Sequence, residues 1–317
     1  MSENSPDSSG KIGYVVLGAT KAEGGTRTVS FRLGGESDLP FIGMNTGQGS
    51  IPLVAFEICD DPEYWSPIVT SYTGDLSNDA REWAGVAEKQ YGADIIRLYL
   101  TSTKRRGFDN FSSITTVMEE VLSGTGLPLV VEGSNEPAID SDVFQRCGEA
   151  GEGERLLLGT AEAGRYRSVA AAALAYHHSV LAQSPIDINL AKQLNILLRE
   201  IGVKADHIMI DPYTGTLGYG FEYSYSVMER IRSAALKGDT DLAMPMITSA
   251  TDSLSVKEVR EADPAALEDI AVEWEFYAAL SSAIAGSSVV CVRHPKTVPL
   301  LKSAFRELWA GKMPGEA

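Results

Sequence analysis

The chain has 317 residues, 44% of them apolar, which is enough for a large core in one large or two ordinary domains. Its formal net charge of −16 argues against nucleic acid and anionic membrane surfaces as partners, because both are negatively charged themselves. The three cysteines, Cys59, Cys147 and Cys291, are isolated from one another and supply neither a disulfide framework nor the ligands of an iron–sulfur cluster. Without a signal-peptide pattern or an apolar run of about 20 residues, we expect a cytoplasmic protein.

The first 50 residues divide into a tail and a hairpin. Residues 1–10 are small, polar and rich in serine, and such a segment cannot bury enough surface to offset the entropy of ordering, so we predict a disordered tail. Two β-forming runs, at 12–17 and 28–33, flank a turn-rich segment and predict an antiparallel hairpin with a longer loop. We therefore assign residues 11–50 to an N-terminal hairpin and lead-in.

Short apolar runs then alternate with helical patterns along the rest of the chain. The strand candidates lie at 53–58, 94–100, 128–133, 155–160, 179–184, 207–211, 242–247 and 288–294. Helical patterns lie at 79–91, 114–122, 167–177, 190–201, 222–236, 265–285 and 299–309.

This alternation implies parallel strands joined by right-handed crossovers. Eight such units predict a (β/α)8 TIM barrel over residues 51–312, followed by a short tail at 313–317. An open doubly wound sheet is the alternative, but no GxGxxG motif follows the first strand candidate.

In a (β/α)8 barrel the working face is built at the carboxyl ends of the strands. The residues that follow the predicted strands are rich in carboxylates, amides and hydroxyls: Glu57, Asp60, Ser102, Thr103, Asn135, Glu136, Glu162, Gln183, Asp187, Asn189, Asp211, Thr214, Thr248, Ser249, Arg293 and His294. Glu57, Glu162 and Asp211 converge if all three point into the barrel mouth, where a buried carboxylate could act as a general acid or base. Structural hydrogen bonding is an equally good interpretation, so we assign no residue a catalytic role.

The segment 211–220, DPYTGTLGYG, carries the most distinctive pattern of the chain. It follows an apolar strand candidate and precedes an amphipathic helical pattern, so we predict a strand, a loop and a helix start. Its glycines permit positive φ and close approach of another molecule, while its threonines and tyrosines supply hydroxyl groups. This composition favours a large polar ligand over a phosphate.

Three other polar segments each have two interpretations. Residues 132–137 form either an ordinary turn or a ligand contact through Asn135. Residues 184–195 resemble a helix start with Asp187 or Asn189 as the N-cap, although these side chains could also face a ligand. The basic run at 104–106 is either a solvated loop or a docking site for an acidic partner or a phosphate.

Four segments of this chain resemble one known family. They are VLGATKAEGGTRT at 16–28, VVEGSNEP at 130–137, AQSPIDINLAKQLNILL at 182–198 and DPYTGTLGYGFEYSYSVMERIR at 211–232. The family is the small subunit of the corrinoid/iron–sulfur protein, also called the delta subunit of the acetyl-CoA decarbonylase/synthase complex. The resemblance covers nearly the whole chain and implies a TIM barrel, in agreement with the strand pattern.

The resemblance also implies a partner and a cofactor. The chain would form a heterodimer with a large corrinoid/iron–sulfur subunit, and a corrinoid (cobamide) would lie between that subunit and the mouth of this barrel. The assembly would receive a methyl group from methyltetrahydrofolate through a methyltransferase and deliver it to acetyl-CoA synthase in the reductive acetyl-CoA pathway. The iron–sulfur cluster would belong to the large subunit alone.

A corrinoid is a broad macrocycle fringed with amides, so its binding surface should offer amide, hydroxyl and backbone partners. On that basis the resemblance places corrinoid contacts at Asn135, Gln183, Asp211, Thr214, Thr216, Gly218 and Tyr219.

Two enzymes remain as rival hypotheses. The first is a free-standing TIM-barrel methyltransferase that binds a pterin directly, in which Asp211, Asn135 and Asp187 would grip the fused ring. The second is an aldolase or lyase, which would need a Schiff-base lysine at a strand end. That second hypothesis is weak, because Lys104 and Lys192 fall in a predicted loop and a predicted helix.

Overall fold

The computed structural model describes residues 10–40, 50–65, 67–133 and 136–309. The predicted tail at 313–317, residues 1–9 of the predicted N-terminal tail and the predicted contact Asn135 lie outside the described residues. Within these ranges, none of the helices combines the length and apolarity that crossing a bilayer requires.

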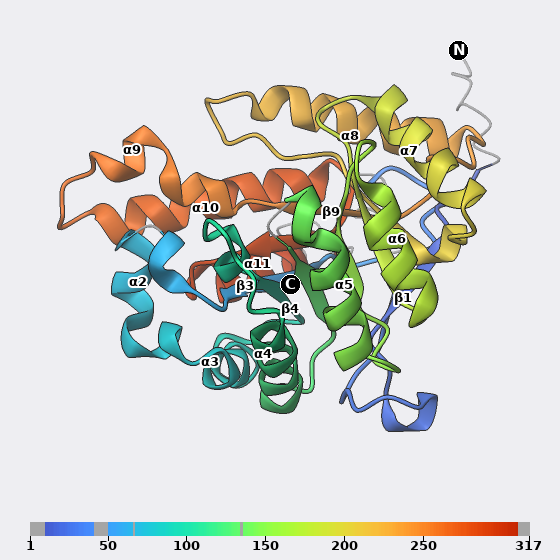
Figure 1. The fold of residues 1–317 in the computed structure, drawn as a ribbon. Coiled ribbons are helices and arrows are strands. Elements are labelled where there is room, and N and C mark those ends of the chain that lie inside the picture. The colour runs from blue at the N-terminus through green and yellow to red at the C-terminus, as the bar shows by residue number, and fades with distance from the viewer. Residues whose placement is uncertain (1–9, 41–49, 66, 134–135, 310–317) are drawn as a thin grey trace, which may run out of the picture.

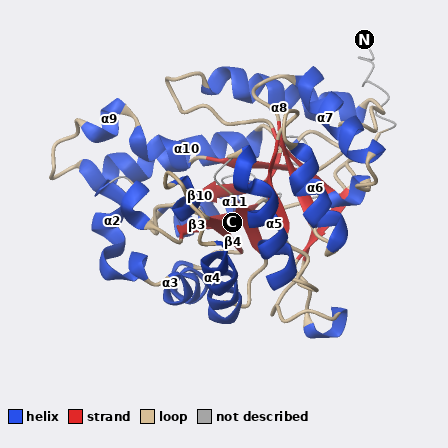
Figure 2. Ribbon diagram, viewed as in Figure 1, coloured by secondary structure: helices blue, strands red, loops and turns tan. Residues whose placement is uncertain are grey.

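Eight parallel strands close into a barrel in the order β10-β3-β4-β5-β6-β7-β8-β9. Figure 2 shows the strands in red, with helices around them. Their bounds are β3 Leu53–Cys59, β4 Ile95–Tyr99, β5 Leu129–Glu132, β6 Leu157–Ala161, β7 Ser179–Gln183, β8 Ile208–Asp211, β9 Met246–Ser249 and β10 Ser287–Val292. The last strand pairs with the first, with Val290 beside Val54, so the predicted TIM barrel is confirmed and the open-sheet alternative is wrong. The strand predicted at 242–247 begins only at Met246, since Pro245 has no N–H to give to the ladder.

Helices surround the barrel on its outside (Figure 1). They are α2 Pro67–Thr73, α3 Ala80–Val86, α4 Phe111–Gly124, α5 Pro137–Ala150, α6 Tyr166–Ala175, α7 Ile188–Glu200, α8 Phe221–Leu236, α9 Lys257–Arg260, α10 Leu267–Ile284 and α11 Thr297–Trp309. Three of them, α2, α5 and α9, were not among the predicted helical patterns. The helical pattern predicted at 79–91 is α3 followed by a π-helical turn, Ala87–Tyr91.

The N-terminal hairpin closes one end of the barrel. Its strands β1, Tyr14–Leu17, and β2, Phe31–Gly34, pair antiparallel, as predicted. Val15, Leu17 and Leu33 pack against a layer of apolar side chains inside the barrel, to which every strand contributes: Ala55, Ile95, Val130, Leu157, Leu181, Met209, Ile247, Val289 and Cys291. Because inward-facing residues recur at every second position of a strand, this layer is a continuous apolar floor. Only the opposite end of the barrel is left for polar chemistry.

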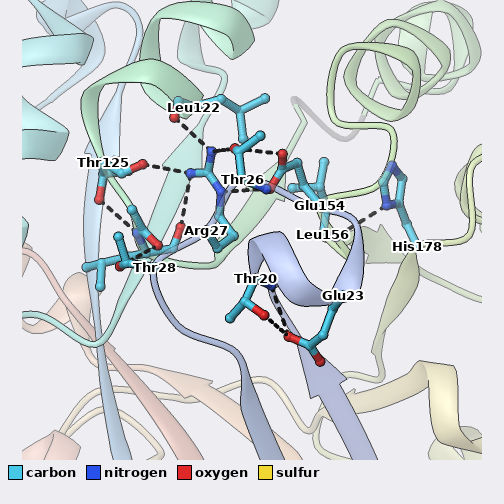
Figure 3. A network of polar contacts seen from close by, with 12 residues as sticks. Thr20, Glu23, Thr26, Arg27, Thr28, Leu122, Thr125, Glu154, Leu156 and His178 are labelled. Atoms are coloured by element: carbon cyan, nitrogen blue, oxygen red, sulfur yellow. Dashed lines mark hydrogen bonds and ion pairs between the residues drawn. The ribbon is translucent and has the colours of Figure 1, made fainter.

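A buried ion pair holds the hairpin loop against the barrel (Figure 3). The guanidinium of Arg27 donates from Nε to Glu154 at 2.7 Å, and it also donates to the carbonyl oxygens of Leu122 and Thr125, both at 2.8 Å. Arg27 and Glu154 are 4% and 6% exposed. The arginine therefore joins the loop between β1 and β2 to the end of α4 and to the connection that precedes β6.

We expect Arg27→Met to lower the free energy of unfolding by about 3–5 kcal/mol, because it leaves the Glu154 carboxylate buried without its counter-ion. Urea unfolding followed by circular dichroism measures the change. Arg199→Met is the matched control, since its pair with Asp241 at 2.6 Å is nearly half exposed and should contribute less than about 1 kcal/mol. Equal losses in the two variants would contradict a structural role for the buried pair.

Candidate functional site

The inward-facing side chains change character from one layer of the barrel to the next. Two residues beyond the apolar floor, most strands carry polar or charged groups instead: Glu57, Arg97, Glu132, Gln183, Asp211, Ser249 and, just beyond β10, Arg293. Because the strands are parallel, these groups all lie toward the carboxyl ends, where TIM barrels build their sites. We call this set the mouth layer.

Arg97 spans the barrel at the mouth layer. Its Nη1 lies 2.7 Å from Glu57 on β3, and its Nη2 forms an ion pair with Glu132 on β5. The same Nη1 donates to the hydroxyl of Ser249 at 2.7 Å, on β9, which is separated from β4 by two strands. The guanidinium therefore occupies the lumen and joins its opposite walls.

Arg293 neutralises the other side of Glu57. Its Nε donates to Glu57 at 2.9 Å, and its guanidinium lies 4.4 Å from the ring centroid of Trp65. Burial alone would raise the pKa of Glu57, but the attraction of Arg293 and Arg97 outweighs it and lowers the pKa. Glu57 is thus an ionised partner of two arginines, and it is not available as a general base.

Asp211 and Gln183 form a second group of contacts in the mouth layer. They lie side by side in the β7–β8 register, and the Gln183 Nε2 donates to Asp211 Oδ2 at 2.7 Å. Burial raises the pKa of Asp211 to about 6, although this bond and one from the backbone N–H of Tyr213 oppose the rise. Because its nitrogen is bound, the amide of Gln183 has its carbonyl oxygen left as an acceptor.

The loop after β8 has the composition that the sequence indicated, and two of its glycines take the expected left-handed conformation, Gly218 with φ 74° and Gly220 with φ 100°. Tyr213 has φ 60°, a conformation unusual for a tyrosine, and the residue is 45% exposed. The Thr214 side chain is buried, and its hydroxyl has no hydrogen-bond partner among the residues that the structure describes.

The predicted contact positions do not all lie together. Gln183 and Asp211 are in contact, and Thr214 follows in the same loop. Tyr219 instead donates its hydroxyl to Glu258 of α9 at 2.9 Å. Gly218 lies against Trp274 of α10. Thr216 is half-buried and closes the turn by accepting N–H bonds from Tyr219, at 2.9 Å, and Phe221.

Two other polar residues named from the sequence have structural partners. Asp187 is the N-cap of α7, accepting from the backbone N–H of Asn189 at 2.7 Å. Glu162 pairs with Arg165 at 2.6 Å and does not join the ion pairs around Glu57. The three carboxylates Glu57, Glu162 and Asp211 therefore do not form one cluster.

Sequence reasoning missed Glu275, a fully buried residue of α10. Its carboxylate accepts the backbone N–H groups of Arg293 at 2.7 Å and His294 at 3.1 Å, so it fixes the end of β10 from which Arg293 reaches Glu57. Burial raises the pKa of Glu275 to about 7 despite these bonds. The available signal was a single acidic residue on the Ala-rich buried face of a helix.

Comparison with known proteins identifies the family. The model of the CO dehydrogenase/acetyl-CoA synthase delta subunit family matches residues 14–280. The delta subunit of the acetyl-CoA decarbonylase/synthase complex of Archaeoglobus fulgidus is 36% identical, over 96% of this chain and 70% of its own. The delta subunit of Methanopyrus kandleri is 33% identical, over 97% of this chain and 78% of its own.

Among solved structures, the barrel is similar to dihydropteroate synthases. The Xanthomonas albilineans enzyme in complex with 7,8-dihydropteroate superposes with a TM-score of 0.59 at 16% identity, over 82% of this chain and 94% of that one. The Coxiella burnetii enzyme in complex with pteroic acid superposes with a TM-score of 0.57 at 14% identity, over 83% of this chain and 95% of that one.

The fold is thus that of a TIM-barrel protein, which the solved structures share at low identity. The sequence matches also show the family, because they cover nearly the whole chain at 36% and 33% identity. The chain belongs to the family of acetyl-CoA decarbonylase/synthase delta subunits.

We expect Glu275 to make stability depend on pH in a defined direction. Its pKa of about 7 lies above the ordinary glutamate value of 4.5, so the folded state binds the proton more tightly and stability falls as pH rises through this interval. The stability of wild type relative to Glu275→Gln should therefore fall by up to about 3 kcal/mol between pH 4.5 and pH 7.5.

Urea unfolding at several pH values measures this difference, and the subtraction cancels other titrating groups such as Asp211. Glu273→Gln, an exposed change on the same helix, is the control and should give a constant difference. A flat wild-type-minus-Glu275→Gln difference would show that the carboxyl stays ionised throughout.

Proposed function

We propose that this chain caps a corrinoid held by a large corrinoid/iron–sulfur subunit, in a heterodimeric methyl carrier. The assembly would take a methyl group from methyltetrahydrofolate, through a methyltransferase, and pass it to acetyl-CoA synthase. The observation that carries this proposal is the filled lumen: Arg97 joins β3, β5 and β9, so the mouth layer is a platform on which a broad ligand can lie. Membership of the delta-subunit family supports it.

The charge of the mouth layer suits a ligand edged with neutral amides. Its two arginines are already bound to Glu57 and Glu132, so neither is a free cation for a phosphate or a carboxylate. Beside Asp211, the neutral groups there are the carbonyl oxygen of Gln183 and the buried hydroxyls of Ser184 and Thr214, which have no hydrogen-bond partner among the residues that the structure describes. Buried polar atoms without partners cost stability unless a ligand or water satisfies them.

The corrinoid would supply the chemistry, since its cobalt accepts and releases the methyl group. The residues of this chain would hold the edge of the ring and exclude water from its face. We propose Gln183, Asp211 and Thr214 as the contacts nearest the mouth, with Thr216, Gly218 and Tyr219 at the rim beside α9 and α10 and Asn135 as a further contact.

The rival function is direct pterin binding by a free-standing methyltransferase. The likeness to dihydropteroate synthases favours this reading at the level of fold alone. Two observations weigh against it: Asp187, which would grip the pterin, caps α7, and the Arg97 guanidinium occupies the lumen.

Coexpression with the large partner under anaerobic conditions, followed by addition of cobalamin, tests the proposal. Size exclusion with visible absorbance should show corrinoid comigrating with a one-to-one complex, and omission of either chain should abolish comigration. A monomer that binds methyltetrahydrofolate and transfers its methyl group without the partner would establish the rival function instead.

A further inference from the structure

A run of basic residues lies in the loop between β4 and α4, at the working end of the barrel. Lys104, Arg105 and Arg106 follow one another there, and all three are exposed. We call residues 104–106 the basic loop. In a chain whose formal net charge is −16, three successive cations are a local exception to the acidic composition. Because the loop follows the carboxyl end of β4, it lies at the same end of the barrel as the mouth layer.

Carboxylates that follow β3 hold the basic loop in place. Asp60 accepts a hydrogen bond from the backbone N–H of Ser102 at 3.0 Å, in the turn that leads into the loop. Asp61 accepts from the Nε of Arg105 at 2.7 Å, and Glu63 accepts from its Nη2 at 3.1 Å. Arg105 is therefore an anchor of the loop. A loop that is already ordered loses little conformational entropy when a partner binds it.

The ammonium group of Lys104 is held beside the mouth without a carboxylate partner. Tyr99 is the next inward-facing residue of β4 after Arg97, since inward positions recur at every second residue. The Nζ of Lys104 lies 4.3 Å from the centroid of the Tyr99 ring, and no carboxylate pairs with it among the residues that the structure describes. The ring thus positions a cation at the rim of the mouth layer.

Arg106 adds a second unpaired cation to the basic loop. It is exposed, and within the described part of the chain it forms no ion pair. The neutral amides at the edge of a corrinoid would not neutralise two cations, so the fitting complement is an anionic surface of a protein. The rest of this acidic chain would repel such a surface. Attraction at one loop and repulsion elsewhere together define one orientation of docking.

We propose that the basic loop receives an acidic surface of the large subunit and so steers that subunit onto the mouth of the barrel. The inference rests on the proposed function, in which the large subunit covers that mouth. It goes further in naming the contact that orients the partner and the chemistry of the surface that meets it. Electrostatic steering acts mainly on the rate of association, and salt weakens it.

The test is stopped-flow association of the full-length chain with its large partner, both freed of corrinoid. It is run at ionic strengths of about 0.01 M and about 1 M, where the Debye length is about 30 Å and about 3 Å. Lys104→Glu combined with Arg106→Glu should lower the association rate constant about tenfold at low salt and less than about twofold at high salt. Lys104→Gln combined with Arg106→Gln should give an intermediate decrease. Both variants keep Arg105, so the anchor of the loop is preserved.

Lys21→Glu combined with Lys204→Glu is the matched control, because it changes the net charge by the same amount. Lys21 lies in the hairpin loop and Lys204 precedes β8, so both are at the end of the barrel that the hairpin covers. Both are exposed and form no ion pair with other described residues. This variant should associate about as fast as the wild type. Equal slowing in the control and in the basic-loop variant would show that net charge governs association, and would refute the inference.

The other outcomes separate this inference from the proposed function. If the basic-loop variants associate as fast as the wild type at low salt, the docking surface is refuted and the capping function stands. If they associate normally but their complexes bind aquocobalamin more weakly, and bind cobinamide, which lacks the nucleotide phosphate, as the wild type does, the loop holds the corrinoid phosphate and the inference fails. A wild-type chain that forms no complex with the large partner would refute both.

Discussion

The guanidinium of Arg97, held across the lumen by carboxylates on two neighbouring strands and a hydroxyl on a third, is the contact on which the working face depends. A buried arginine is tolerated only where several acceptors surround it, and Glu57, Glu132 and Ser249 provide them. The Arg97 side chain thereby fills the lumen at the mouth layer.

The two ends of the barrel have opposite character for a simple geometric reason. Inward-facing residues two positions apart on a strand lie in successive layers of the barrel. Most strands change from an apolar to a polar residue between the same two layers, so one layer is apolar and the next is polar. The hairpin covers the apolar layer, and the ion pair between Arg27 and Glu154 holds the hairpin loop against the barrel. Polar chemistry is thereby confined to the carboxyl ends.

Positions around the mouth are fixed by supporting residues in the neighbouring elements. Glu275 of α10 fixes the backbone at Arg293, which in turn holds Glu57, and Asp211 fixes the amide of Gln183. Each support is a buried carboxyl group that accepts hydrogen bonds from N–H groups of its neighbour, and such directional bonds orient a group. The fold shared with dihydropteroate synthases does not by itself determine the site, because one barrel fold can carry different sites.

The amino-acid sequence by itself determined the alternation of strands and helices, the N-terminal hairpin, and the polar character of the strand ends, because each follows from local periodicity and residue type. It did not reveal which polar groups neutralise one another. Glu57 was a candidate base until Arg97 and Arg293 were seen to bind it, and Asp187 could have faced a ligand until it was seen to cap α7. Glu275 matters because it binds the backbone of Arg293, which lies on another element. Only closure of the barrel brings such residues together, since hydrogen bonds and ion pairs depend on distances in space that residue spacing does not encode.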